Sequence, residues 1–449
     1  MDDGRALGSM WQLLLREFQP QFTCGGWIRF VDWTTGMILC DEEHTITQIL
    51  TSMGMESRWR ALEAFVEYGS WDRDAVERQL MHVIEDSQPT PFAGYRVVAI
   101  DDTKEHRTSP DVWGTCTFHE SSARSPNRAE TVRAHNWVEM GDLVQGKPWI
   151  YLPCASRLYF RESQLPVGEE FKTKTAHAAD MLREVDAESE NPVLAAFDGA
   201  YAVETVIKPC LNPGDGQRRI DFVTRLRLDA RLYLPLADTP KNPNGGRPRT
   251  WGRRIAAPQN HAKWDVAWQK GRAYIHGRMR TFRYKRIRCY WSVAGPKHPV
   301  FAYVFEVDGY RKPWYVVTSA RKLSAAQVVT VQAARFRQED GFRDHKQRFG
   351  MEECRAWTKA PVLRTFQVQM VAQSLLRLMQ FQLDDICGEG NWWPVPQWNP
   401  NKHHPSILDL RRLFWRHRSR FSKLLLRLED MKEPRQAHFP CGRAAARAA

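Results

Sequence analysis

Residues 171–209 change from helical periodicity to a short apolar run and back again. The helical stretch FKTKTAHAADMLREV precedes NPVLAAFDGAYA, whose apolar run ends at Asp198, and AYAVETVIK is again helical. A helix, a strand, an acid, a turn and a helix in this order are typical of an α/β sheet with a site at the carboxyl ends of its strands. We therefore predict an α/β fold with Asp198 at that edge, where it can also cap the following helix.

A second apolar run, GYRVVAIDDT at residues 94–103, also leads into acidic residues. Strands that end in carboxylates are a common rigid support for metal ligands. Because adjacent strand residues point to opposite faces, only one of Asp101 and Asp102 can face a site. The run favours Asp102 slightly, on the assumption that the strand ends there, and the acidic pair also suits a simple turn or cap.

A third acid, Glu339, lies in a helix predicted over residues 323–349, between a serine N-cap and a glycine stop. At about 100° per residue, Glu339 shares a narrow arc of this helix with Arg335, Phe342 and Lys346. A carboxylate between two cations can form an ordinary ion pair on a solvated helix face. The two aspartates elsewhere in the chain favour a functional role instead.

Carboxylates at Asp102, Asp198 and Glu339 would supply oxygen ligands only, which Mg²⁺ prefers. Hydrolysis or strand transfer of phosphodiesters by two metal ions needs several carboxylates held around those ions. We therefore predict that these three acids are catalytic and hold two Mg²⁺ ions, with Mn²⁺ as a substitute.

The chain is basic, with 65 Lys and Arg against 52 Asp and Glu and a net charge of +13. This excess favours polyanionic partners, nucleic acid first and an acidic membrane surface second. No apolar stretch is long enough to span a bilayer, and the N-terminal MDDGRALGSM lacks the regions of a signal peptide. We expect a cytoplasmic, nucleoid-associated protein without a membrane partner. The nine cysteines form no Cys-x-x-Cys pair, so we expect neither a disulfide framework nor a zinc knuckle.

Regions of different character flank these motifs. Residues 1–90 are mostly helical, either a DNA-binding module or a subdomain that packs on the core, and the sequence favours neither. Residues 225–320 are β-rich and basic, and RMRTFRYKRIRCYW predicts a strand with one cationic and one packed face. We expect Trp291 to be buried rather than to stack on a base. Arg247 and Arg249 lie in the extended run GRPR, which suits phosphates or a minor groove.

The stretch SILDLRRLFWRHRSRFSKLLLRL predicts a helix near the C-terminus with a basic side, which suits a phosphate backbone or solvent. Its cations are Arg411, Arg412, Arg416, Arg418, Arg420 and Lys423. The tail after Glu433 is poor in apolar residues, and we predict that it is disordered.

The order of the acids resembles the ribonuclease-H-like catalytic domain of DDE transposases from bacterial insertion sequences. IDDT resembles the family's strand that ends in an acid followed by Thr, which favours Asp102. FDGAY is similar to the family's second acidic motif and places its acid at Asp198. The FHE, HNWV, GGRPR and PSILDLRRL runs also look like this superfamily, so the resemblance extends from Thr45 to Leu413.

The family signature around the glutamate is Tyr-x2-Arg-x3-Glu-x6-Lys. Arg335, Glu339 and Lys346 match it at the right spacing, whereas Gln332 stands at the tyrosine position. The resemblance implies that Arg335 and Lys346 contact phosphates near the cleaved end. It puts the phosphate contact at Gln332 in doubt.

The resemblance also implies a ribonuclease-H-like core that is interrupted by a β-rich insertion. The expected regions are a helical DNA-binding region at 1–90, the core at 91–224 and 321–390, the insertion at 225–320, and a basic helical region at 391–449.

The activity implied is that of a DNA transposase, which cleaves the ends of its element and joins them to target DNA. The partners implied are double-stranded DNA and a second copy of the chain, as a homodimer on paired ends. Arg343 would join Arg335 and Lys346 in binding DNA, and Arg247 and Arg249 would hold the flanking DNA. Two alternatives remain: a nuclease of the same fold without transposition, and a non-enzymatic DNA-binding regulator.

Overall fold

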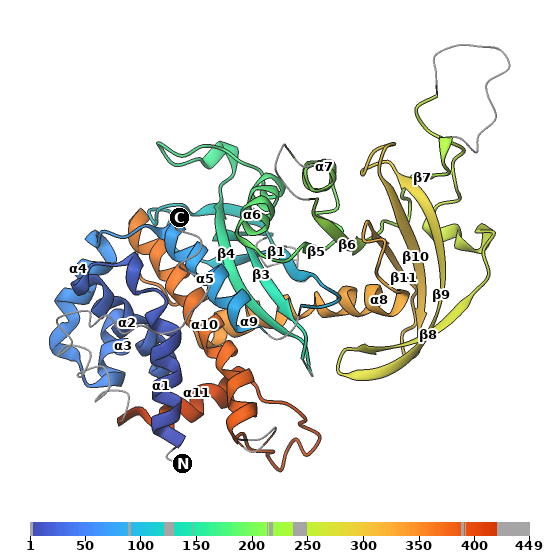
Figure 1. Cartoon of the computed structure of the whole chain (residues 1–449). Helices are drawn as coiled ribbons and strands as arrows, with labels where there is room; N and C mark the ends of the chain where they lie inside the picture. The colour runs from blue at the N-terminus through green and yellow to red at the C-terminus, as the bar shows by residue number, and fades with distance from the viewer. Residues whose placement is uncertain are drawn as a thin grey trace.

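The computed structural model describes residues 3–88, 91–120, 130–146, 148–212, 214, 219–236, 249–387, 390 and 392–419. Within these ranges the chain forms eleven α-helices and one eleven-stranded mixed sheet, so the predicted α/β class is confirmed (Figure 1). The helices are α1 (Asp3–Arg16), α2 (Cys24–Leu39), α3 (Ile46–Met53), α4 (Trp59–Tyr68), α5 (Arg73–Ser87), α6 (Lys174–Glu188), α7 (Glu204–Leu211), α8 (Ala325–Ala334), α9 (Arg337–Arg348), α10 (Lys359–Cys387) and α11 (Ile407–Arg416). The strands are β1 (Arg96–His106), β2 (Cys116–His119), β3 (Thr131–Val144), β4 (Ile150–Tyr159), β5 (Val193–Phe197), β6 (Asp221–Arg225), β7 (Leu232–Tyr233), β8 (Gln269–Ile275), β9 (Arg278–Trp291), β10 (Pro299–Val307) and β11 (Trp314–Thr318).

The sheet runs in the order β2-β3-β1-β5-β6-β11-β10-β9-β7, with β4 also paired to β3 and β8 to β9. Strands β1, β5 and β6 are parallel to one another, and β6 pairs with β11 in the antiparallel sense. The β-rich segment therefore continues the same sheet. In Figure 1 its strands form one end of the molecule, and α8 extends from them toward the centre.

Strand β1 has an apolar core on each side, as expected for a buried strand with helices on both faces. Val97 and Ala99 pack in a core that also contains the buried side chains of α8. Val98 and Ile100 pack in a larger core that contains the buried side chains of α6. The two faces of β1 thus look toward different helices, and successive residues alternate between them.

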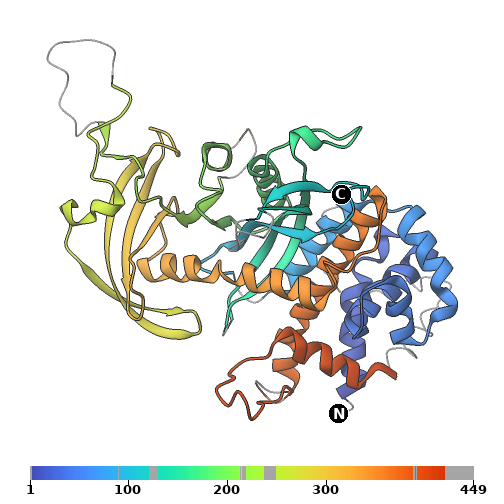
Figure 2. The ribbon, with the colours of Figure 1, turned by 180° about the vertical axis from the view of Figure 1, so that it is seen from behind.

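The N-terminal helices pack against the long helix α10, which lies between them and the sheet (Figures 1 and 2). Buried residues of α1 to α5 share one hydrophobic core with α10 and α11, and Trp11, Phe30 and Leu375 are at most 1% exposed. None of the helices in the described ranges combines the length and apolar character that crossing a membrane would need. The N-terminal region is packed onto the rest of the protein through this shared core.

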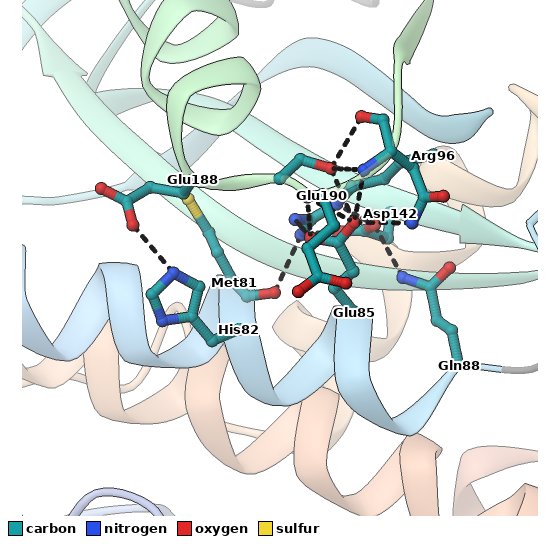
Figure 3. A network of polar contacts seen from close by, with 10 residues as sticks. Met81, His82, Glu85, Gln88, Arg96, Asp142, Glu188 and Glu190 are labelled. Atoms are coloured by element: carbon teal, nitrogen blue, oxygen red, sulfur yellow. Dashed lines mark hydrogen bonds and ion pairs between the residues drawn. The ribbon is translucent and has the colours of Figure 1, made fainter. Parts of the chain in front are cut away.

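A buried ion-pair network holds the start of β1 (Figure 3). Arg96 is 2% exposed, and its guanidinium donates to Asp142 of β3 through Nε to Oδ1 (2.7 Å) and Nη2 to Oδ2 (3.0 Å). It also donates to Glu85 Oε2 of α5 (3.0 Å) and to the Met81 carbonyl (3.0 Å). Glu85 in turn accepts from Asn191, just before β5. The network joins α5, β3, β1 and the approach to β5.

Two predicted boundaries were wrong. Strand β1 does not end at its acids but continues to His106, because its antiparallel pairing with β3 extends that far. The helix predicted over 323–349 is two helices, since the Phe336 and Gln338 N–H groups bond to carbonyls three residues back rather than four. This tighter hydrogen bonding separates α8 from α9.

One of the cations predicted for the basic face of the C-terminal helix, Arg411, is buried instead. Arg411 is 7% exposed, and its guanidinium donates to the carbonyls of Ile38 (3.1 Å) and Cys40. Carbonyls at the end of a helix lack partners within that helix, so Arg411 caps the end of α2 instead of facing outward. The predictions for Arg247, Arg420, Lys423 and the tail after Glu433 lie outside the described residues.

Candidate active site

On the α8 and α9 side of the sheet, Asp198 lies near Asp101, and Arg335 links Asp101 to Glu339. Asp101 continues the face of Ala99, which packs in the core beneath α8. Asp198 follows Phe197, the register partner of Ile100, so it lies alongside Asp101 across the parallel pair. Asp198 thus comes directly after the end of β5, whereas Asp101 lies within β1, which continues to His106.

Arg335, at the junction of α8 and α9, joins two of these acids. Its Nη1 lies 3.4 Å from Asp101 Oδ2, and its Nη2 lies 3.3 Å from Glu339 Oε1. The Arg335 side chain is 9% exposed, that of Asp101 is 24% exposed, and that of Glu339 is 46% exposed. The buried cation therefore bridges a strand carboxylate and a helix carboxylate that solvent can reach.

The electrostatic setting of Asp101 is unfavourable for its charged form. Burial raises the pKa of Asp101 to about 6, and the nearby carboxylates of Asp102 and Asp198 act in the same direction. The backbone N–H of Asp102, which donates to Asp101 Oδ1 at 2.9 Å, and the guanidinium of Arg335 partly offset this effect. An additional cation close to Asp101 would favour its ionised form.

Asp102, which the sequence favoured over Asp101, lies on the other face of the sheet. Its carboxylate accepts from Lys174 Nζ of α6 (2.7 Å) and from the Tyr201 hydroxyl (3.0 Å). Because β1 continues past the acids, strict alternation turns Asp102 away from the side that carries Arg335 and Glu339. The structure thus places Asp198 near Asp101, links Asp101 to Glu339 through Arg335, and leaves Asp102 in a separate ion pair.

The acids that share a face have the donor chemistry of a magnesium site, since all their ligand atoms are carboxylate oxygens. Within the described ranges, no group of three or more Asp, Glu, His or Cys side chains is already close enough to hold a metal ion. The Arg335 guanidinium stands between two of the three acids. The residues therefore fit the ion by chemistry, while the cation that now joins Asp101 to Glu339 is an arginine.

The residues predicted to bind DNA differ in their surroundings. Lys346 Nζ donates to the Lys104 carbonyl (2.6 Å), and Arg343 is exposed and pairs with Asp340 (2.9 Å). Arg249 is exposed. The side-chain oxygen of Gln332, at the position of the family tyrosine, is buried without a hydrogen-bond partner in the described structure.

Sequence reasoning missed two neighbours of the acids. Glu139 is the cross-strand partner of Asp101 on β3 and is 1% exposed. Arg225 is exposed at the end of β6, directly after Thr224, the register partner of Phe197. A charged residue inside the apolar run HNWVEMGDLV and a basic residue at the end of DFVTR were the available signals. Their meaning depends on the strand order, which the sequence does not display.

Carboxylates on adjacent parallel strands, with a third on a helix over the same face, are oxygen ligands on rigid elements, as metal-assisted phosphodiester chemistry requires. The fold and the site therefore define an α/β protein of nuclease type. A family model described as DDE superfamily endonuclease matches residues 17–286, more than half of the chain. The chain belongs to this family. The matched range includes Asp101 and Asp198 and ends before Glu339. The search of curated proteins found no match to the chain.

Proposed function

We propose that this protein is the transposase of a bacterial insertion sequence, which cleaves the ends of its element and joins them to target DNA. Membership of the DDE superfamily endonucleases supports a nuclease-type or transposase-type activity on DNA. The observation that carries the proposal is that Arg335 pairs with both Asp101 and Glu339, while the carboxylate of Asp198 acts on Asp101. The net charge of +13 supports a polyanionic substrate.

We assign the metal-binding role to Asp101, Asp198 and Glu339, with Asp101 in place of Asp102. Bound Mg²⁺ would activate the attacking hydroxyl and stabilise the leaving oxygen. Arg335 balances the charge of Asp101 and Glu339. As the family resemblance implies, it would also contact a phosphate near the cleaved end. Lys346 and Arg343 of α9, together with Arg247 and Arg249, contribute cations to the DNA surface.

The proposal includes a ribonuclease-H-like core, interrupted by the β-rich segment 225–320. The strand order supports this division, because β7 to β11 come between β6 and α8 in the chain and extend the sheet beyond β6, with β11 paired to β6. It also includes a homodimer on paired DNA ends and a place in the cytoplasm, associated with the nucleoid.

The test is Mg²⁺-dependent cleavage of a DNA fragment that carries the element end. We expect Asp101→Asn, Asp198→Asn and Glu339→Gln to lower the cleavage rate at least about 1000-fold, as loss of a metal ligand should, while DNA binding in a gel-shift assay is retained. Asp229→Asn, which removes an exposed carboxylate that pairs with Arg227, is the control and should cleave normally. An active Asp101→Asn variant beside an inactive Asp102→Asn variant would reverse the assignment.

One observation favours the regulator as a second candidate. Gln332 replaces the tyrosine of the family signature, and its buried oxygen has no hydrogen-bond partner in the described structure. A regulator would bind element ends but leave them intact with Mg²⁺ or Mn²⁺ at any pH tested. A nuclease without transposition would cleave the ends but give no joined product with target DNA.

A further inference from the structure

We propose that Gln338 is a positioning residue that sets Glu339 at the correct distance from Asp101, and this inference rests on the proposed function. Gln338 precedes Glu339 in the first turn of α9 and is fully buried. Its side-chain Nε2 donates to the backbone carbonyl of Glu139 (3.0 Å) and to the Tyr151 hydroxyl (3.1 Å). The residue beside the helical acid is thus bonded directly to the sheet.

The strand residue that Gln338 contacts is the neighbour of the other acid. Glu139 of β3 is the register partner of Asp101 of β1 in the antiparallel pair. Residues opposite each other in such a pair are about 5 Å apart, so the Gln338 contact is made one strand away from the Asp101 carboxylate. One chain of contacts from Glu339 to Asp101 passes through Gln338 and Glu139, and a second passes through Arg335, which pairs with both acids.

The surroundings hold this contact in one geometry. The Tyr151 hydroxyl donates to Glu139 Oε1 (2.9 Å), and His345 Nδ1 lies 3.5 Å from Glu139 Oε2. A Cβ atom added at Gly341 of α9 would lie 2.3 Å from a ring carbon of Tyr151. The glycine therefore lets α9 rest directly on β4, with Gln338 at hydrogen-bonding distance from both strands.

Glu139, Tyr151, Gln338 and His345 form a buried polar cluster, and stabilisation of the folded state does not explain why these residues are polar. Buried atoms without a hydrogen-bond partner in the described structure include Glu139 Oε2, Gln338 Oε1, both ring nitrogens of His345 and Gln373 Oε1. Replacing a partly satisfied polar group by an apolar group of similar size is often neutral or stabilising. A displacement of a reacting group by about 1 Å, in contrast, can lower a rate by about 100-fold. The cluster is therefore better suited to setting a position than to adding stability.

The experiment compares Gln338→Met with Tyr151→Phe and their double variant in the full chain. Three quantities are measured: the thermal unfolding temperature, DNA affinity by fluorescence anisotropy, and the single-turnover cleavage rate as a function of Mg²⁺. For Gln338→Met we expect an unchanged or higher unfolding temperature, unchanged DNA affinity and a cleavage rate about 100-fold lower at saturating Mg²⁺. Tyr151→Phe should show a smaller loss, and the double variant should lose no more than Gln338→Met alone.

Gln367→Met is the matched control. Gln367 is an equally buried glutamine, but its Nε2 donates to the Arg73 carbonyl (2.7 Å), away from α9. This variant should leave the dependence of cleavage on Mg²⁺ unchanged. Cleavage by Gln338→Met at the rate of the unaltered protein would overturn the inference. A lower cleavage rate accompanied by a matching fall in the unfolding temperature would also overturn it, because lost stability would then explain the lower rate.

A titration with Mn²⁺, followed by the electron paramagnetic resonance signal of the free ion, gives a readout that does not need cleavage. We expect Gln338→Met to weaken Mn²⁺ binding about 10-fold relative to Gln367→Met. If the unaltered protein binds Mn²⁺ but does not cleave, the proposed function fails while this comparison still tests the positioning role. If Gln338→Met binds Mn²⁺ as the unaltered protein does, the positioning role fails.

Discussion

At the scale of single residues, the Asp101 carboxyl group links the site to stability. Its pKa in the folded protein, about 6, lies above the ordinary value of 3.8, mainly because the group is buried. The folded state therefore holds this proton more tightly than the unfolded state. The resulting contribution to stability is fully present below about pH 4 and is lost as the pH rises through about 6.

The first prediction is that Asp101→Asn stabilises the protein at pH 8 in the absence of divalent ions. Asparagine resembles the neutral acid, so the gain should be at most roughly 3 kcal/mol at pH 8 and should vanish near pH 4. Urea unfolding in EDTA at both pH values measures it. A variant that is less stable at pH 8 would show that the ion pair with Arg335 outweighs the effect of burial.

The second prediction concerns Arg225, which is exposed beside the acids. Its carbonyl lies 4.0 Å from the position of a Cβ on Gly199, directly after Asp198. We expect Arg225→Ala to weaken DNA binding and to lower the slope of log affinity against log salt by about 1, as loss of one phosphate contact should. Arg283→Ala is the control, because Arg283 of β9 already pairs with Glu306 of the neighbouring strand β10 (2.5 Å). Equal effects of the two changes would contradict a specific role for Arg225.

At the scale of elements, the sequence predicts one helix over residues 323–349, whereas the structure has two helices there, α8 and α9. α8 packs in the core beneath the β-rich strands, whereas α9 rests on β4 and β1 through Gln338 and Gly341. The junction places Arg335 beside Asp101. The residues on both sides of the junction are compatible with a helix, so local sequence did not reveal the break.

The third prediction is that Arg96→Met destabilises the protein by about 3–5 kcal/mol, since it leaves Asp142 and Glu85 without their buried cation. Chemical unfolding measures this change. Arg227→Met, which removes an exposed ion pair with Asp229, should leave the unfolding midpoint unchanged. A small effect of Arg96→Met would mean that the network of Figure 3 rearranges around the new side chain.

At the scale of the whole molecule, the N-terminal helices complete a core rather than stand apart. Helices α1 to α5 bury apolar side chains in the same core as α10 and α11. Both ends of the described chain therefore contribute to one packed unit, as Figures 1 and 2 show.

The fourth prediction is that residues 91–449 alone do not form a stable monomer. Removal of α1 to α5 would expose the apolar surface of α10, and large exposed apolar patches promote association. Soluble yield, gel filtration and a thermal melt followed by circular dichroism test this expectation. A monomeric fragment with a cooperative melt would instead make residues 1–90 a separable domain.

Local sequence patterns predicted several features of the protein correctly. They indicated an α/β fold, an apolar strand ending before Asp198 and a buried Trp291. Each of these depends on the hydrophobicity and order of residues close together in the chain. The resemblance to DDE transposases rested on short motifs of the same kind, and the family match agrees with it at the level of the superfamily.

Only the tertiary structure decided which aspartate joins Glu339, and it decided this through the length of β1. The pairing of β1 with β3 continues to His106, so alternation turns Asp101 toward Arg335 and Asp102 toward Lys174. The burial of Arg411 and the contact from Gln338 to Glu139 depend in the same way on elements distant in sequence. The sequence by itself determined which acids were available, because local patterning sets strands and helices. Long-range packing determined their faces, because a side chain points toward whatever its strand or helix is packed against.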